Sequence, residues 1–253
     1  MTLTGKTAIV TGASRGIGAA AARHLAELGA HVLLCARSTA QVEAIAAEIA
    51  AAGGKAIPLP ADVADAAAMQ TAIDRAVDET GRLDILVNNA GVIEPIARLA
   101  DSDPAEWDRV VDINLKGVYH GLRFAIPAML ATGGGTIINI SSGAATGALE
   151  GWSHYCATKA GVLSLTKVAD LEYRDRGIRV VGLSPGTVAT GMQVQIKASG
   201  INPVSQLDPS AHIPPDWVAR AIAWLCTEAG DAHRGTDVSL RAPEIRAALG
   251  LPG

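Results

Sequence analysis

The sequence predicts an α/β fold in which helices cover both faces of a doubly wound, seven-stranded parallel sheet. Short apolar runs alternate with helical stretches along the 253 residues, and no repeat, low-complexity tract or linker interrupts them. Strands that are apolar almost throughout are typical of parallel sheets buried on both faces. The first of these runs leads directly into a glycine-rich loop. We therefore expect a single domain over residues 1–253.

The elements follow from this pattern in chain order. Residues 6–10 form a short apolar run that is expected to be a buried strand, and the alanine-rich stretch from Ala19 to Leu25 favours a helix near 15–28. Further strands are expected at 31–35, 55–59, 84–87, 135–140, 178–183 and 236–240. Further helices are expected near 39–52, 65–80, 104–131, 152–175 and 215–229.

Composition and charge exclude several classes of protein. Hydrophobic residues make up 49% of the chain and charged residues 18%, which is ordinary for a globular protein with a substantial core. No apolar run approaches the ~20 residues that a membrane helix needs. The net charge of −4 and the lack of a basic stripe argue against nucleic acid as a partner.

The N-terminus and the cysteines favour a cytoplasmic location. The chain enters its first expected strand almost at once, which leaves no room for a signal peptide. The cysteines, Cys35, Cys156 and Cys226, are scattered and odd in number, so neither a disulfide framework nor a zinc site is expected. We predict a reducing, cytoplasmic setting and no bound metal.

The loop after the first expected strand has the spacing Gly-x-x-x-Gly-x-Gly, from Gly12 through Gly16 to Gly18. Between a strand and a helix, such a loop presents free backbone N–H groups and the positive helix end to an anion. Glycine is needed where the backbone approaches a pyrophosphate closely and where the helix packs on the sheet. The loop indicates a phosphate cradle, and an ordinary glycine-rich turn is the alternative.

Tyr155 and Lys159 are four residues apart, which places both side chains on one face of a helix. An ammonium stabilises phenolate, and one charge at about 4 Å with an effective dielectric of about 20 contributes roughly 4 kcal/mol. Moving a tyrosine pKa from ~10 to near neutrality needs about the same free energy. The pair is expected to act as a proton donor if the two side chains converge. Alone, this spacing also occurs by chance on solvated helices.

Further polar and glycine motifs fall where the expected strands end. They are Thr11, Asn88, the pair Ser141 and Ser142, and Pro185 with Gly186. In an open parallel sheet, ligands bind beyond the carboxyl ends of the strands. One edge of the sheet is therefore expected to collect every motif.

Taken together, these motifs resemble those of the short-chain dehydrogenase/reductase family over nearly the whole chain. The residues that carry the resemblance are Thr11 to Gly18, Asp62, Asn88 to Gly91, Asn114, Ser142, Tyr155 with Lys159, and Pro185 with Gly186. The resemblance implies a Rossmann fold and a reversible oxidoreductase that reduces a ketone to a secondary alcohol with a nicotinamide cofactor. It also implies a cofactor-binding part at about 1–140 and a catalytic and substrate-binding part at about 141–253.

The resemblance implies catalytic roles for four residues. Tyr155 is expected to be the general acid in ketone reduction and the general base in the reverse reaction. Lys159 is expected to lower the pKa of Tyr155 and to hold the nicotinamide ribose, and Ser142 to donate a hydrogen bond to the substrate oxygen. Asn114 matches the family residue that helps to retain a water in the proton relay to Lys159. A polar residue satisfied internally at a helix kink is the alternative for Asn114.

The same resemblance implies the cofactor contacts. They are Gly12, Ser14, Arg15, Gly16, Ile17 and Gly18 in the glycine loop; Asp62 and Val63 at the adenine; Asn89, Ala90 and Gly91 at the adenosine ribose; Tyr155 and Lys159; and Pro185, Gly186, Val188 and Thr190 at the nicotinamide carboxamide. From the residues alone, Asp62 can also prepare the helix start that Asp65 caps, and Asn89 can be a turn residue.

The end of the second expected strand indicates which cofactor is bound. In folds that prefer NAD, an acidic residue usually stands there, about twenty residues past the glycines. Here the sequence is Leu34-Cys35-Ala36-Arg37, so the acid is missing and an arginine follows. Arg15 and Arg37 can form a guanidinium pair that matches a ribose 2′-phosphate. In the family this combination marks the NADP(H)-preferring branch, and two solvated arginines are the alternative.

The substrate pocket is expected to use Ser142, Ala144, Trp152 and Met192. The segment 188–214 is long and irregular and is expected to act as a mobile lid. Its apolar side chains favour an uncharged, fairly hydrophobic ketone or secondary alcohol, but packing of two short helices explains them equally well. His154 is left out of the mechanism, because adjacent residues on a helix point about 100° apart.

Two other functions stay open. A 3-ketoacyl-carrier-protein reductase needs basic residues near its pocket for the acidic carrier, and Arg174, Arg176 and Arg179 are candidates. Thr236 to Arg241 replace the family's aspartate-glycine-glycine after the last strand, which argues against that substrate and against the usual tetramer contacts. The second alternative is a non-catalytic NADP(H)-binding sensor, although such proteins typically lose the tyrosine or the lysine.

The resemblance also implies a homodimer or a homotetramer. Family members commonly associate through the long helices expected here near 104–131 and 152–175. Candidate contact residues are Ala125, Ala128, Ala160 and Val168, which can equally face the sheet. The expected partners are thus a second copy of the chain and a small-molecule ketone or alcohol.

Overall fold

A computed structural model describes residues 1–252 and contains one sheet of seven parallel strands. The strands are β1 (Thr7–Thr11), β2 (His31–Ala36), β3 (Lys55–Pro60), β4 (Ile85–Asn88), β5 (Gly135–Ile140), β6 (Ile178–Ser184) and β7 (Asp237–Ser239). Their order across the sheet is β3-β2-β1-β4-β5-β6-β7. The chain thus builds one half of the sheet outward from β1, then crosses over and builds the other half. The predicted fold class is confirmed.

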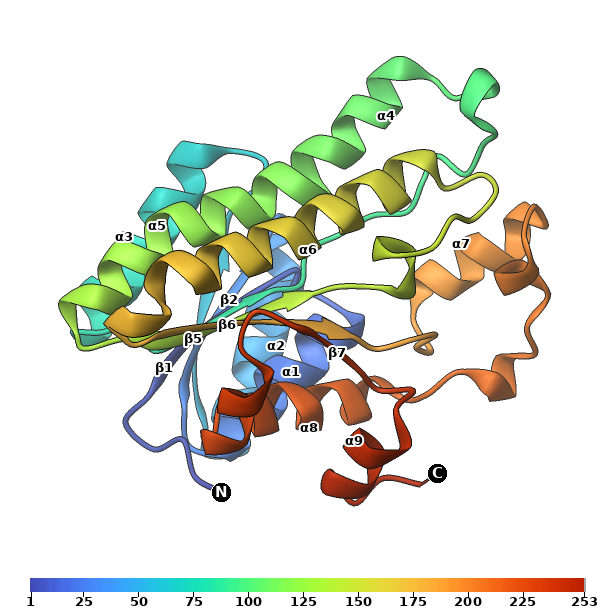
Figure 1. Cartoon of the computed structure of the whole chain (residues 1–253). Helices are drawn as coiled ribbons and strands as arrows, with labels where there is room; N and C mark the ends of the chain where they lie inside the picture. Colours follow the sequence, from blue (N-terminus) through green and yellow to red (C-terminus); the bar gives the residue numbers. More distant parts are fainter. Residues whose placement is uncertain (253) are drawn as a thin grey trace.

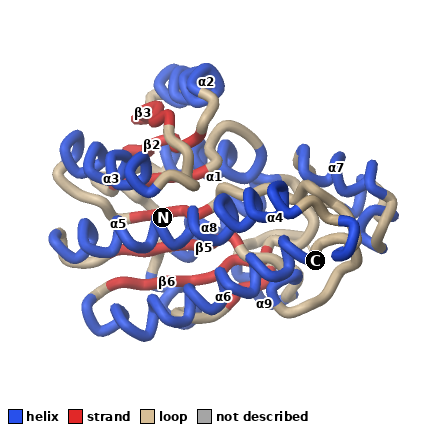
Figure 2. Tube along the Cα trace, turned by 90° about the horizontal axis from the view of Figure 1, so that it is seen from above, coloured by secondary structure: helices blue, strands red, loops and turns tan. Residues whose placement is uncertain are grey.

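Helices cover both faces of this sheet. They are α1 (Gly16–Glu27), α2 (Thr39–Ala51), α3 (Ala66–Thr80), α4 (Pro104–Val111), α5 (Gly117–Ala131), α6 (Ser153–Tyr173), α7 (Gly191–Ser199), α8 (Pro215–Leu225) and α9 (Pro243–Ala248). The long helices α5 and α6 cross one face together with α3, and α1 and α8 cover the other (Figures 1 and 2). No helix within residues 1–252 combines the length and the apolar character needed to cross a bilayer.

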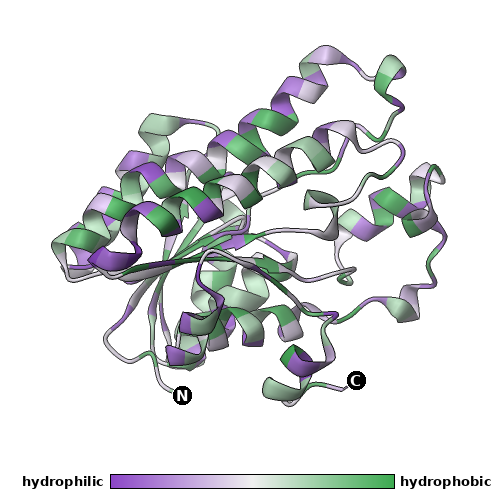
Figure 3. Ribbon diagram, in the orientation of Figure 1, coloured by the Kyte–Doolittle hydropathy of each residue, from purple (hydrophilic) through white to green (hydrophobic). Residues whose placement is uncertain are grey.

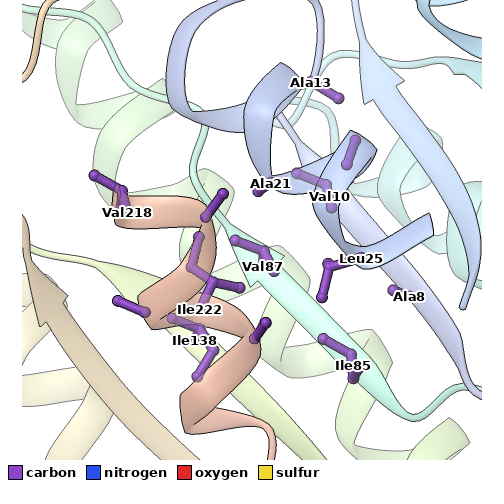
Figure 4. Close-up of a cluster of buried hydrophobic side chains, with 14 of the residues drawn as sticks. Ala8, Val10, Ala13, Ala21, Leu25, Ile85, Val87, Ile138, Val218 and Ile222 are labelled. Atoms are coloured by element: carbon purple, nitrogen blue, oxygen red, sulfur yellow. The ribbon is translucent and has the colours of Figure 1, made fainter. Parts of the chain in front are cut away.

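Each face has its own hydrophobic core, because successive strand residues point to opposite sides of a sheet. On the side of α1 and α8, the buried side chains of Val10, Val87 and Ile222 pack together (Figure 4). On the other side, Ile9 and Leu86 pack beneath α3 and α5. Figure 3 accordingly shows the central strands as mainly hydrophobic. Burial on both faces is the reason why the central strands are continuous apolar runs in the sequence.

The helix predicted at 104–131 is interrupted, and those predicted at 152–175 and 215–229 end early, at Tyr173 and Leu225. The stretch 104–131 consists of α4, a π-helical turn at Asp112–Lys116 and α5. The π turn contains Asn114, whose side chain bonds to the backbone of Val92 and so ties the helix to the loop after β4. The stretch 152–175 ends as α6 followed by a 3-10 turn.

The short C-terminal helix α9 did not follow from the sequence pattern. Ile245 and Leu249 are buried in the core on the side of α1 and α8. Arg220 of α8 donates a 2.6 Å hydrogen bond to the Leu249 carbonyl oxygen, and the Arg246 guanidinium lies 5.5 Å from the centre of the Trp217 ring. The segment after β7 therefore packs back against α8 within the same chain.

Candidate active site

A cleft of about 2020 Å³ lies at the carboxyl ends of the strands. Its wall includes the loops after the six strands β1 to β6 and the segment that contains α7. Pockets for single small molecules usually measure about 300–1,000 Å³. The cleft therefore has room for a dinucleotide and a substrate together.

The glycine loop forms the wall of this cleft at the start of α1. Gly12 and Gly16 have φ angles of 63° and 55°, a region that other residues rarely adopt. A Cβ on Gly18 would lie 2.3 Å from the Gly12 carbonyl oxygen, so only glycine lets α1 pack this closely. Arg15 precedes α1 and makes no side-chain hydrogen bond to its backbone. The first N–H groups of α1 are thus open to an anion, which fits a dinucleotide phosphate.

Nearly all of the predicted cofactor residues line the same cleft. They are Gly12, Ser14, Arg15, Gly16, Ile17, Arg37, Asp62, Val63, Asn89, Ala90, Gly91, Tyr155, Lys159, Pro185, Gly186, Val188 and Thr190. Gly18 differs from them, because it is buried beneath the loop and acts through close packing. The ends of six strands, β1 to β6, thus bring together residues that are up to 178 positions apart, from Gly12 to Thr190.

Two of these residues also hold the backbone in place. Asn89 Nδ2 donates a 2.8 Å hydrogen bond to the Thr11 carbonyl oxygen, and the Asn89 backbone N–H donates to Thr11 Oγ1 at 2.9 Å. These bonds tie β4 to β1 at the cleft. Asp62 Oδ1 accepts from the Ala64 backbone N–H at 3.0 Å, while Asp65 caps α3. Asp62 is therefore a turn residue that also faces the cleft.

Arg15 and Arg37 are exposed and line the cleft. Neither forms an ion pair with a carboxylate among residues 1–252. Ala36 and Ser38, on either side of Arg37, also line the cleft. The end of β2 thus presents a guanidinium and no carboxylate.

Tyr155 and Lys159 lie on the first turns of α6 and both line the cleft. Lys159 Nζ lies 5.6 Å from the centre of the Tyr155 ring and donates a 2.6 Å hydrogen bond to the Ile140 carbonyl oxygen. Ser142 lies two residues beyond the end of β5 and lines the same cleft. The structure therefore brings three of the four predicted catalytic residues together at the end of β5.

Burial is the largest influence on both ionisable groups. It raises the pKa of Tyr155 to about 12, and the neighbouring Ser142 side chain acts in the opposite direction. It lowers the pKa of Lys159 to about 8, and the Asp237 carboxylate acts against this. The prediction that Lys159 brings the Tyr155 pKa toward neutrality is wrong for this structure. The loss of hydration by the phenolate outweighs the effect of the Ser142 hydrogen bond.

Asn114 fits the alternative interpretation of its sequence context, a polar residue whose hydrogen bonds are satisfied internally at a helix kink. Its side chain is 1% exposed. Its Oδ1 accepts from the Val92 backbone N–H at 2.8 Å, and its Nδ2 donates to the Val92 carbonyl oxygen at 2.8 Å. The Asn114 side chain therefore holds the loop after β4, and a role in a proton relay stays a prediction.

An apolar cluster adjoins Tyr155 at the other end of the cleft. It contains Ile93, Ala144, Trp152, Tyr155 and Ile196, with Met192 packed against it. The Trp152 ring meets the Tyr155 ring edge-on, with the ring centres 5.5 Å apart. The residues predicted to bind substrate are thus gathered around the phenol.

The segment 188–214 covers this apolar end. It contains α7 and two short 3-10 turns. Gln195 of α7 donates a 2.7 Å hydrogen bond to Glu94 in the loop after β4, which links the two sides of the cleft. Ile196 is buried in the apolar cluster, whereas Val194 is 71% exposed. The apolar residues of this segment therefore serve both interpretations: some pack the short helix and turns, and others line the apolar end of the cleft.

Three arginines that were candidates for the pocket mouth lie elsewhere. Arg174 and Arg176 follow α6, and Arg179 lies at the start of β6, so all three are at the end of the sheet opposite the cleft. Arg179 pairs with Asp231 at 2.6 Å, and Arg174 pairs with Asp170 at 3.0 Å. These residues are therefore not candidates for docking an acidic carrier beside the pocket, because the direction of β6 places them away from it.

Asp237 and Arg241 lie near the site and were not singled out as functional from the sequence. Ser141 Oγ donates a 2.9 Å hydrogen bond to Asp237 Oδ2, which joins β5 to β7. Arg241 lines the cleft, and its Nε would lie 3.1 Å from a Cβ on Gly186. The unusual ending from Thr236 to Arg241 was the available signal for both. By contrast, the His154 side chain is buried, and its Nε2 lies 2.8 Å from the Ile93 carbonyl oxygen. This hydrogen bond is to the backbone, so His154 stays outside the proposed proton transfer.

Comparisons with known proteins place the chain among dehydrogenases and reductases. The short chain dehydrogenase family matches residues 6–200. Identity is 43% over 227 residues with 3-oxoacyl-(acyl-carrier-protein) reductase FabG of Staphylococcus aureus, covering 88% of this chain and 91% of that protein. It is 39% over 242 residues with D-threitol dehydrogenase of Mycolicibacterium smegmatis, covering 93% and 91%. It is 34% over 226 residues with cyclohexanol dehydrogenase of Acinetobacter sp., covering 88% of each.

A solved structure agrees with these matches. The crystal structure of a short-chain type dehydrogenase/reductase from Mycobacterium marinum covers 94% of this chain and 94% of that chain, with a TM-score of 0.86 and 33% identity. The fold and the cleft define an oxidoreductase that acts on an alcohol or carbonyl group of a small molecule with a nicotinamide cofactor. The chain belongs to the short-chain dehydrogenase/reductase family.

Proposed function

We propose that the protein is an NADPH-dependent reductase that converts an uncharged, apolar ketone to a secondary alcohol in a reversible reaction. One observation carries the proposal. Tyr155 lies between Lys159, Ser142 and an apolar cluster, inside a cleft with room for both cofactor and substrate. A bound nicotinamide would supply the hydride in this chemistry.

Tyr155 is the proton donor in this proposal. Because its pKa is raised to about 12, the phenol is protonated at neutral pH, the form that a general acid needs. Ser142 lines the cleft beside it and has a hydroxyl that can donate to the substrate oxygen as negative charge develops there. Both groups thus act on the same oxygen of the substrate, Tyr155 as the proton donor and Ser142 as a hydrogen-bond donor.

Lys159 acts on the phenol through its charge. Its ammonium is held at the Ile140 carbonyl oxygen, 5.6 Å from the centre of the Tyr155 ring. A cation at this distance stabilises the phenolate that remains after the proton has been delivered. The two other N–H groups of the ammonium remain for hydroxyl groups of the nicotinamide ribose.

The preference for NADPH rests on two arginines. Arg15 and Arg37 line the cleft with no carboxylate as a partner among residues 1–252, and Ala36 stands where an acid would bind a ribose 2′-OH. A guanidinium pair gives bidentate hydrogen bonds to a phosphate. These residues would hold the 2′-phosphate of NADPH.

The apolar cluster supports the proposed class of substrate. Trp152, Met192 and Ile196 surround the approach to Tyr155, and they offer no charge to a polar or ionic substrate. Burial of apolar surface stabilises binding by roughly 25 cal/mol for each Å². A cyclic or branched ketone with little polarity fits this surface best.

A second function is favoured by one comparison. The 43% identity with a 3-oxoacyl-(acyl-carrier-protein) reductase supports reduction of a 3-ketoacyl thioester. The positions of Arg174, Arg176 and Arg179 at the opposite end of the sheet argue against it, since an acidic carrier needs basic residues near the pocket. A short thioester substrate without the carrier separates the two possibilities.

The proposal is tested by following NADPH consumption with a panel of cyclic ketones, diketones, quinones and an acetoacetyl thioester. We expect turnover of apolar ketones and a kcat/KM that is higher with NADPH than with NADH. Tyr155→Phe protein prepared in parallel controls for contaminating reductases. Turnover of the thioester alone would favour the carrier-protein reductase. Binding of NADPH with no turnover of any substrate would favour a sensor and overturn the proposal.

We also propose that two copies associate through α5 and α6. Tyr119, Val168 and Leu171 on these helices are 49%, 46% and 70% exposed. Ala125 is fully buried and faces the sheet, so it is not a contact residue. Light scattering should give at least the mass of a dimer, and Leu171→Glu should reduce it toward that of one chain.

A further inference from the structure

Asp237 places a carboxylate on the face of the sheet that α6 covers. It stands in one row with Gly182 of β6 and Asn139 of β5. Residues in one row of a parallel sheet have their side chains on the same face. Asn139 Nδ2 donates a 2.9 Å hydrogen bond to Thr166 of α6, which identifies the face. The Asp237 carboxylate is therefore on the side of the sheet from which Lys159 reaches the cleft.

Gly182 makes room for this carboxylate to lean across β6. A Cβ on Gly182 would lie 2.9 Å from Asp237 Oδ1, closer than carbon and oxygen atoms tolerate. Across this gap, Asp237 Oδ2 accepts a 2.9 Å hydrogen bond from Ser141 Oγ. The edge strand β7 thus holds the end of β5 by a contact that passes over the strand between them.

The contact between Asp237 and Ser141 lies next to the backbone group that binds Lys159. Lys159 Nζ donates to the Ile140 carbonyl oxygen at 2.6 Å, and Ser141 is the following residue. Asp237 Oδ1 is buried and has no hydrogen-bond partner among residues 1–252. One of the two carboxylate oxygens of Asp237 therefore accepts no hydrogen bond, so the negative charge of the group is only partly balanced by hydrogen-bond donors.

The positively charged groups that influence the Asp237 carboxylate lie on α6. Lys159 and Lys167 both favour the ionised carboxylate, although burial raises the pKa of Asp237 overall. In return, Asp237 opposes the effect of burial on Lys159. The other carboxylate on this side, Asp170, lies further along α6 and pairs with Arg174 at 3.0 Å. Asp237 is thus the carboxylate whose charge acts on the Lys159 ammonium.

We propose that Asp237 is a positioning residue of the active site, which holds Ser141 next to the Ile140 carbonyl that binds Lys159 and places a carboxylate on the face of the sheet from which Lys159 reaches the cleft. The inference rests on the proposed role of Lys159 in catalysis. Without the carboxylate, the ammonium would remain buried but lose its opposing charge, so it would release its proton at a lower pH. The support that Lys159 gives to the Tyr155 phenolate would then be lost at the upper end of the working range.

The test is to measure the titration of Lys159 directly in the full-length protein. NMR of protein labelled with ¹³C-lysine reports it through the side-chain Cε resonance, assigned with Lys159→Met. In Asp237→Asn we expect the midpoint to fall by roughly one pH unit, and the alkaline limb of the kcat profile to move with it. Ser141→Ala keeps the carboxylate, so it should lower kcat severalfold and leave the midpoint near that of the wild type.

Asp170→Asn is the matched control, because it removes a buried carboxylate that serves a different partner. Its Lys159 midpoint should equal that of the wild type. Equal midpoints in Asp237→Asn and wild type, or an equal fall in Asp170→Asn, would overturn the proposal. If Asp237→Asn does not fold, Asp237→Ser provides the same comparison with a smaller side chain. The titration needs no turnover, so a failure of the proposed reductase activity would remain distinguishable.

Discussion

Lys159 Nζ lies 5.6 Å from the centre of the Tyr155 ring and is held by a 2.6 Å hydrogen bond to the carbonyl oxygen of Ile140. Ile140 is the last residue of β5, and Ser142 lies two residues further on. The end of one central strand therefore positions two neighbours of the phenol. The first turns of α6 position the phenol itself.

Replacing Tyr155 tests this arrangement. Tyr155→Phe removes the hydroxyl that donates the proton, so kcat should fall by about 10²–10⁴-fold, the usual contribution of a general acid. The Kd for NADPH, measured by fluorescence titration, should stay within about twofold, because the ring and its packing against Trp152 remain. Tyr173→Phe at the other end of α6 is the matched control. A kcat within tenfold of the wild type would remove Tyr155 from the mechanism.

Arg37 is expected to govern the choice of cofactor. A hydrogen bond to a charged group contributes about 1.5–3 kcal/mol, so Arg37→Ala should weaken NADPH binding by roughly 10- to 100-fold. NADH lacks the 2′-phosphate, and its Kd should change little. Calorimetry with both cofactors measures the difference. Arg109→Ala, another exposed arginine that lines the cleft, is the control. An equal loss for both cofactors in Arg37→Ala would contradict the predicted contact.

The inner face of α7 is expected to select apolar substrates. Met192 packs against the apolar cluster, and its truncation should cost about 1 kcal/mol of transition-state binding, or roughly fivefold in kcat/KM. Met192→Ala should therefore lower kcat/KM for a cyclic ketone more than for a small hydroxyketone. Val194→Ala on the exposed face of the same helix should change neither value. A uniform effect on both ketones would show that Met192 does not act through substrate burial.

Asp84 makes the stability of the fold depend on pH. Burial alone would raise the pKa of this carboxyl, but hydrogen bonds from Arg82, the Thr7 backbone and Lys6 lower it on balance. A folded-state pKa below the unfolded value of ~3.9 stabilises the protein above that pH. This contribution is lost as the pH falls through the folded-state value.

The free energy of unfolding in urea should accordingly decrease as the pH is lowered below about 4. In Asp84→Asn this part of the decrease should be absent, and the variant should already be less stable at pH 7. Asp74→Asn, on the exposed surface of α3, should retain the decrease. Identical pH dependence in Asp84→Asn and the wild type would refute the assignment.

Much of the fold follows from local pattern. Each strand begins and ends within one residue of its expected position. For the central strands the reason is that burial on both faces requires an unbroken apolar run. The helices were less regular than expected where a tertiary contact intervenes. Asn114 bonds to Val92, in a distant loop, and the helix around it takes a π turn that no local propensity indicates. Helix α9 packs on α8 through Leu249 and Arg246, contacts that a short C-terminal segment does not reveal.

The sequence by itself determined the order of the elements, the glycine loop and the four-residue spacing of Tyr155 and Lys159, because these depend on neighbours along the chain. Only the tertiary structure decided the direction of the Tyr155 pKa, the distance of Arg179 from the cleft and the approach of Asp237 to Ser141. Each of these depends on what surrounds a group once the sheet has formed. Burial and charges from distant parts of the chain determine the pKa values and contacts of residues that the sequence had already identified as candidates.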